Sequence, residues 1–111
     1  MAANGRRGEI AATIDGRERI LCLTLGALAQ LEAAFGESDL NGLAERFATG
    51  RLSARDLMRI VAAGLCGGGE HVIEDDVAAM TADGGLAALA ETVAQLLRLT
   101  FGDSAKVSPD P

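Results

Sequence analysis

The sequence has no tryptophan or tyrosine, and its 111 residues include only three phenylalanines and one lysine, Lys106. This scarcity of aromatic rings argues against a platform on which nucleic-acid bases stack. Nine arginines are scattered among sixteen acidic residues, and the formal net charge is −6. Because proteins that bind duplex DNA cluster Lys and Arg to neutralise phosphates, we do not expect nucleic acid to be a partner.

Residues that build catalytic and metal sites are also scarce, with one histidine and two cysteines. A structural zinc site needs four Cys or His ligands at set spacing, and a catalytic nucleophile needs a neighbouring base. Neither pattern occurs. Cys22 lies among leucines and is expected to be a small buried hydrophobe, whereas Cys66 could be a partly exposed thiol. We therefore expect no enzyme, no metal and no cofactor.

No apolar run approaches the roughly 20 residues that span a bilayer, so no membrane contact is expected. The charged start of the chain is not followed by the apolar segment of a signal peptide, which favours a cytoplasmic protein. Apolar residues form 49% of the sequence, as is typical of a folded domain. We expect one domain over residues 8–101, a flexible arm over 1–7 and a disordered tail over 102–111.

A β-hairpin is predicted at the beginning of this domain. Ile10, Ala12 and Ile14 alternate with other residues along one strand, and Asp15-Gly16 is a strong hairpin-turn signal. The return strand is expected over 19–23. The turn can contain two residues or four (15–18), so the register stays open. Because an isolated hairpin is marginally stable, it must pack on helices or pair with another chain.

About five short helices are predicted after the hairpin, so the fold class is α+β and mostly α in one compact domain. The first runs from an N-cap at Thr24 to Phe35, and the second covers about 40–47 and stops at Gly50. The third follows a capping box formed by Ser53 and Asp56, the fourth covers 75–82, and the fifth covers 86–101. The apolar faces predict this core: Ile14, Leu23, Leu28, Leu31, Phe35, Phe47, Leu57, Ile60, Val61, Leu89, Val93 and Leu97.

Four glycines, Gly64 and the run Gly67–Gly69, and the acidic residues that follow them have separate interpretations. Gly64 lies on the apolar face of the third helix and suggests close approach of another helix. The run Gly67–Gly69 follows a helix and has no associated Lys, so we interpret it as a helix stop and flexible connector rather than a phosphate loop. The acidic residues around His71 lack the spacing of a calcium loop and are expected to be the solvated beginning of the fourth helix.

Two groups of residues are candidate partner contacts. Arg51, Arg55 and Arg59 recur every four residues along one flank of the third helix, as in a docking edge for an acidic partner, or simply a solvated face. Leu96 and Leu99 lie outside the apolar face of the last helix. They could contact a partner helix or mediate self-association; alternatively, the N-terminal arm or hairpin covers them.

The succession of segments resembles a known family. The helical stretch Leu43-Ala-Glu-Arg-Phe-Ala-Thr-Gly50 precedes the capped segment 51–65 and the run Cys66-Gly-Gly-Gly69, and a strand leads into a helix over 21–36 upstream. Over residues 7–101 this pattern resembles the small tail protein of gene transfer agents, the phage-like particles of alphaproteobacteria. The family looks like the tail assembly chaperones of long-tailed phages and has also been labelled a tail tube protein.

The resemblance implies a non-enzymatic role in tail morphogenesis. The leading interpretation is a tail assembly chaperone that binds the tape measure protein and tail tube subunits, with residues 8–101 as the chaperone-like domain. The alternative is a structural subunit of the tail tube or tail terminus, in which case the protein would belong to the virion-like particle. A helix-binding adaptor unrelated to tails is a third hypothesis. Chaperones of this kind need an apolar groove that accepts amphipathic helices.

Overall fold

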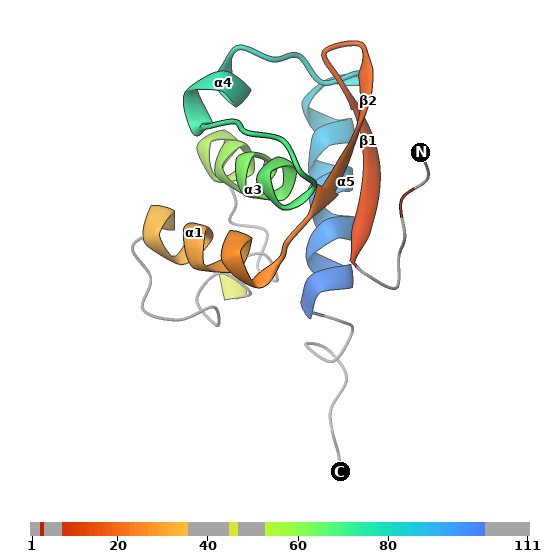
Figure 1. Ribbon diagram of the computed structural model, residues 1–111. Coiled ribbons are helices and arrows are strands. Elements are labelled where there is room, and N and C mark those ends of the chain that lie inside the picture. Colours follow the sequence, from red (N-terminus) through yellow and green to blue (C-terminus); the bar gives the residue numbers. More distant parts are fainter. Residues whose placement is uncertain (1–2, 4–7, 36–44, 47–52, 102–111) are drawn as a thin grey trace.

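A computed structural model describes residues 3, 8–35, 45–46 and 53–101 (Figure 1). A two-stranded antiparallel hairpin is followed by helices, which confirms the predicted fold class. Four helices with defined bounds lie in this described part, rather than the expected five. The elements in chain order are β1 (Glu9–Ile14), β2 (Arg17–Cys22), α1 (Leu25–Phe35), α3 (Ala54–Gly67), α4 (Glu74–Ala78) and α5 (Gly85–Phe101).

The hairpin turn contains two residues. Asp15 and Gly16 have φ angles of 60° and 75°, the left-handed values of a type I′ turn, and Ile14 pairs with Arg17. This register settles the turn length that the sequence left open, and it starts the return strand at Arg17 rather than at residue 19. Ile14 is buried on the inner face, and Leu21 on β2 pairs with Ile10 and is fully buried. The hairpin thus packs on helices, one of the two expected outcomes.

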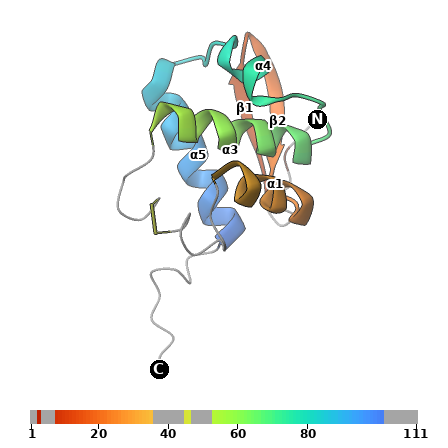
Figure 2. The same cartoon turned by 90° about the vertical axis from the view of Figure 1, so that its left-hand side faces the viewer.

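Helix α3 is the centre of the fold. It contacts β2, α1, α4 and α5, and the two views show α4 above it and the last turns of α5 below it (Figures 1 and 2). Every residue from Ile60 to Leu65 is buried, as expected for a helix enclosed on all sides. The predicted capping box is confirmed, because Ser53 Oγ accepts from Asp56 N–H at 3.1 Å and Asp56 Oδ2 accepts from Ser53 N–H at 2.9 Å.

Gly64 allows two elements to approach α3 closely. A Cβ atom at this position would lie 2.9 Å from Leu21 Cδ2 and 3.2 Å from Leu96 Cδ2. The expectation that another helix comes close is therefore confirmed for α5, and β2 comes closer still. Any larger residue would push the strand and the helix away from α3.

Gly67 and Gly68 have a packing role that the sequence alone does not indicate. Their missing Cβ atoms would lie 1.8 Å from the carbonyl oxygen of Cys22 and 2.0 Å from that of Ile20. The C-terminal end of α3 consequently rests directly on the backbone of β2. The glycine run ends the helix, as expected, but its first two residues form a tight helix–strand contact rather than a connector alone.

The remaining helices follow their predicted bounds with one correction. Thr24 Oγ1 accepts from Ala27 N–H at 3.1 Å, which confirms the N-cap of α1. Helix α4 ends at Ala78 and not at 82, because residues 81–83 extend alongside the hairpin and Ala82 forms a bridge with Ile14. The predicted helix over 40–47 lies outside the described residues except at Glu45 and Arg46, which are helical. The predicted arm and tail also lie outside them, apart from Ala3.

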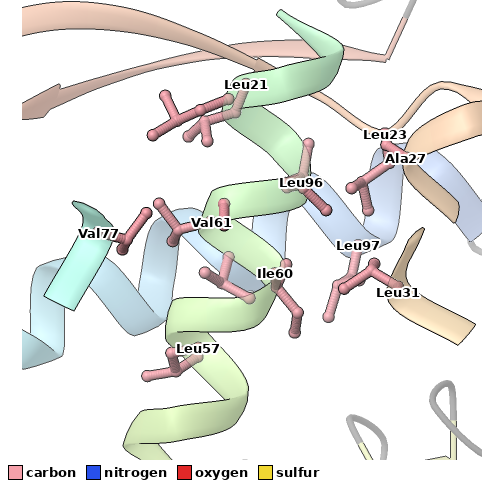
Figure 3. Close-up of a cluster of buried hydrophobic side chains, with 14 of the residues drawn as sticks. Leu21, Leu23, Ala27, Leu31, Leu57, Ile60, Val61, Val77, Leu96 and Leu97 are labelled. Carbon is pink, nitrogen blue, oxygen red and sulfur yellow. The ribbon is translucent and has the colours of Figure 1, made fainter. Parts of the chain in front are cut away.

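The core largely matches its prediction (Figure 3). Eight of the twelve expected residues are buried, Leu28 and Leu89 are partly buried, and the side chain of Phe35 and the whole of Phe47 lie outside the described part. The buried eight are Ile14, Leu23, Leu31, Leu57, Ile60, Val61, Val93 and Leu97. Buried residues that the prediction missed are Leu21, Ala27, Ala62, Ala63, Leu65, Val77 and Leu96.

Candidate interaction surface

Leu96 is fully buried, as expected if the hairpin covers it, and it is therefore not exposed for contact with a partner. It packs between α3 and the hairpin, close to Gly64 and Leu21 (Figure 3). The physical reason is that α5 contacts both β1 and α3, which widens its buried face beyond a single stripe. Leu99 is 44% exposed and remains available to a partner.

The predicted arginine edge is divided in the structure. Arg51 lies outside the described residues, and Arg55 is exposed in the first turn of α3. Arg59 turns towards α4, where its Nε lies 3.6 Å from Glu74 Oε1, and its Nη1 lies 4.0 Å from Asp56 Oδ1. Its side chain is 24% exposed. Arg59 therefore links α3 to α4, at the opposite side of α3 from the last turns of α5 where Leu99 lies (Figures 1 and 2).

A second ion-pair cluster joins the hairpin to the segment after α3. Arg19 Nη1 donates to Glu70 Oε1 at 2.6 Å, and Arg17 Nη2 lies 3.7 Å from the same oxygen. Sequence reasoning missed this cluster because Arg19 and Glu70 are 51 residues apart. Both arginines pair with Glu70, which is one of the acidic residues around His71.

Two other acidic residues of that region, Glu74 and Asp76, also have structural roles. Asp76 Oδ2 accepts from the Ile73 N–H at 2.9 Å and caps α4, and Glu74 pairs with Arg59. Within the described ranges, no group of three or more His, Cys, Asp or Glu side chains could hold a metal ion. In the same part of the chain, no helix has both the length and the apolar character needed to cross a bilayer.

A shallow groove of about 220 Å³ runs along the outer edge of β1, between that strand and the first half of α5. Its walls are mainly small side chains, and its one ionisable lining residue is Asp83. The lining residues are Ala11, Ala12, Thr13, Ile14, Ala82, Asp83, Ala88, Leu89 and Thr92. Sequence reasoning did not find this groove, because it depends on how α5 and residues 81–83 dock against the hairpin.

Among the residues that the structure describes, four large apolar side chains are exposed, but they belong to different elements. They are Leu25 at the beginning of α1, Ile73 before α4, and Leu86 and Leu99 towards the two ends of α5. Scattered exposed leucines are ordinary on protein surfaces and do not mark a site individually. The β1 groove is thus the better-defined feature, and a contact surface is the kind of site that this geometry offers.

Comparison with known protein families shows which family the chain belongs to. Residues 7–103 match the family described as "Phage tail tube protein, GTA-gp10". The chain belongs to this family. The match covers most of the sequence and includes every helix and strand described above. No curated protein and no solved structure matches the chain. Membership of the GTA-gp10 family identifies a tail protein, whose partners are other proteins of a tail assembly.

Proposed function

We propose that the protein is a non-enzymatic structural component of the tail of a gene transfer agent or phage-like particle, in the tail tube or at its terminus. The family match over residues 7–103 carries this proposal, because the family is described as a tail tube protein. In this role the chain would act through contacts with neighbouring subunits and would be present in the finished particle.

The described surface is compatible with such contacts. It combines the β1 groove with the exposed Leu99 and Arg55, which we retain as proposed partner contacts together with Arg51. Apolar side chains at an interface set the lifetime of a complex, and charged residues at its rim mainly set the association rate. Leu96 and Arg59 are not proposed as contacts, since one is buried and the other pairs with α4.

A tail assembly chaperone that binds the tape measure protein and tube subunits is the second candidate. One observation favours it: the sheet in the described part of the chain has two strands, whereas a tube subunit is expected to contribute a larger sheet to ring closure. A chaperone would hold the helical tape measure protein temporarily and leave before the particle matures. Its interface would accordingly be modest in size, so that tube subunits could displace it.

Composition of purified particles separates these candidates. Mass spectrometry of mature, gradient-purified particles should detect the protein at a stoichiometry comparable with other tail proteins if it is structural. A chaperone should be absent from particles but should recover tape measure fragments when the two are co-expressed and captured by an affinity tag. The matched control is the Leu99→Ser variant, which should fold normally and weaken capture. Absence from particles together with failure to bind any tail protein would refute both candidates.

A further inference from the structure

Residues 81–83 demonstrate that the outer edge of β1 accepts an extended chain. Asp83 N–H donates to the Thr13 carbonyl oxygen at 3.2 Å, and Asp15 N–H donates to the Thr81 carbonyl oxygen at 2.7 Å. These bonds flank the antiparallel bridge between Ile14 and Ala82. The chain therefore begins a third strand beside the hairpin and contributes only a few residues to it.

The same edge continues beyond this short segment. In an antiparallel ladder, residues whose N–H and C=O groups bond to the partner strand alternate with residues whose groups point away from it. Ala11 lies two residues before Thr13, so its N–H and C=O point in the same direction as those of Thr13, away from β2. In the part of the chain that the structure describes, no hydrogen bond links these two groups of Ala11 to another element. Gly84 and Gly85, with φ angles of 87° and 81°, turn the chain away into α5 directly after Asp83. The third strand stops there and leaves the edge open.

The groove beside this edge indicates what could complete the strand. Ala88 and Thr92 of α5 line it together with Ala11, and these small side chains leave space for those of an incoming strand. Asp83 is exposed at the end of the groove and forms no ion pair within the described residues. An extended chain that continues the direction of residues 81–83 would begin beside this carboxylate.

We propose that the open edge of β1 binds an extended segment of a partner protein as a third strand, antiparallel to β1, with a Lys or Arg near its N-terminal end beside Asp83. Main-chain hydrogen bonds to Ala11 would provide affinity, and small or β-branched side chains would fill the groove. A second copy of this chain is a poorer occupant, because two molecules of net charge −6 repel each other. That the partner is another tail protein rests on the proposed function; the edge itself is testable without it.

The first test uses the full chain and two synthetic peptides, acetyl-Lys-Val-Thr-Val-Ala-Ser-amide and its analogue with Glu in place of Lys. In a ¹⁵N-resolved NMR titration, the Lys peptide should shift the amide resonance of Ala11 and of its neighbours on β1. N-methylation of the peptide amides that face β1 should weaken binding about tenfold, the effect of losing roughly 1.4 kcal/mol of hydrogen bonding. This comparison leaves the protein unchanged, so its outcome does not depend on the folding of a variant.

Two variants locate the site. Ala11→Pro removes an N–H that points away from β2, a substitution that edge strands tolerate, and should reduce affinity about tenfold with an unchanged melting temperature. Asp83→Lys should lower the affinity for the Lys peptide about two- to fivefold and raise the affinity for the Glu peptide, as expected for one exposed ion pair. The control is Asp75→Lys on α4, which makes the same change of charge away from the groove and should alter neither affinity.

Four outcomes would overturn the proposal. The edge is not the site if the peptide shifts resonances elsewhere and not those of β1, or if N-methylated and parent peptides bind equally well. The proposed occupant is wrong if the chain forms a dimer at micromolar concentration that Ala11→Pro dissociates. Failure of these tests would leave the tail function standing, because detection in particles is independent of them. Conversely, a tail partner that binds the parent and the folded Ala11→Pro variant equally would refute the edge but support the function.

Discussion

Arg19 on β2 and Glu70 after α3 form an ion pair in which Nη1 lies 2.6 Å from Oε1, and the Arg19 side chain is 9% exposed. The Nε of Arg19 also donates to the Ile14 carbonyl oxygen at 3.1 Å. One guanidinium thus joins the end of β1 to the segment between α3 and α4. A nearly buried, charge-assisted contact of this kind is stronger than an exposed surface pair.

We expect Arg19→Met to lower the free energy of unfolding by about 1–3 kcal/mol, because it leaves Glu70 and the Ile14 carbonyl without this donor. Methionine preserves much of the apolar stem, so the loss reports mainly on the hydrogen bonds. Arg17→Met is the matched control, since Arg17 is 67% exposed and lies 3.7 Å from the same carboxylate. It should change stability by less than about 1 kcal/mol. Equal urea midpoints for the two variants would contradict the importance of the Arg19 contact.

Gly68→Ala should destabilise the fold by about 1–3 kcal/mol or more, because its Cβ would overlap the Ile20 carbonyl oxygen and force α3 away from β2. Gly26→Ala in α1 is the opposite case, as the nearest atom to its Cβ would be Thr24 Oγ1 at 3.9 Å. Removing the conformational freedom of this helical glycine should stabilise the protein by about 0.4–1 kcal/mol. Thermal melting of both variants provides the comparison, and a neutral Gly68→Ala would show that the helix–strand contact can relax.

Leu96→Ala should cost about 2–5 kcal/mol, the usual penalty for creating a cavity at a fully buried leucine. Leu99→Ala on the same helix should cost less than about 1 kcal/mol, because Leu99 is 44% exposed and loses less buried area. Chemical denaturation of the two variants measures this difference directly. Similar losses at both positions would mean that α5 is rotated relative to the arrangement described here.

Ser53→Ala should lower stability by about 1 kcal/mol, because the Asp56 N–H loses its capping acceptor at the start of α3. Ser53→Thr keeps a hydroxyl at the same position and is the control. The loss should appear as a lower urea midpoint with an unchanged m-value, since the folded surface stays the same. If Ser53→Thr is as unstable as Ser53→Ala, side-chain volume rather than the hydrogen bond governs this site.

Local signals in the sequence predict much of this fold. Asp15-Gly16 specifies the hairpin, and Thr24 and Ser53 specify where α1 and α3 begin, because each acts on backbone groups within a few residues. The end of α4 was not predictable in this way. Its extension to 82 fails because the residues after Ala78 bond to β1, a contact between segments more than 60 residues apart.

The candidate contact residues were harder to place for the same reason. Helical periodicity puts Leu96 at the margin of an apolar face, but the width of that face depends on α5 packing against both β1 and α3. The spacing of Arg55 and Arg59 suggests that both side chains lie in the same surroundings, but Arg59 forms an ion pair with Glu74 of α4. The sequence did not indicate Ala11 as a contact residue, since an open strand edge is a property of the assembled sheet and not of a residue type.

The enclosed position of α3 has a consequence for how the molecule opens. Backbone amides from Ile60 to Leu65 are surrounded by the hairpin and by three helices, so solvent can reach them only when most of the domain comes apart. Their hydrogen exchange should report the global free energy of unfolding. The amides of Asp15 and Asp83, whose bonds hold residues 81–83 to the hairpin, should exchange through smaller fluctuations. A third strand could thus be exchanged at the edge of the sheet while the centre of the domain stays closed.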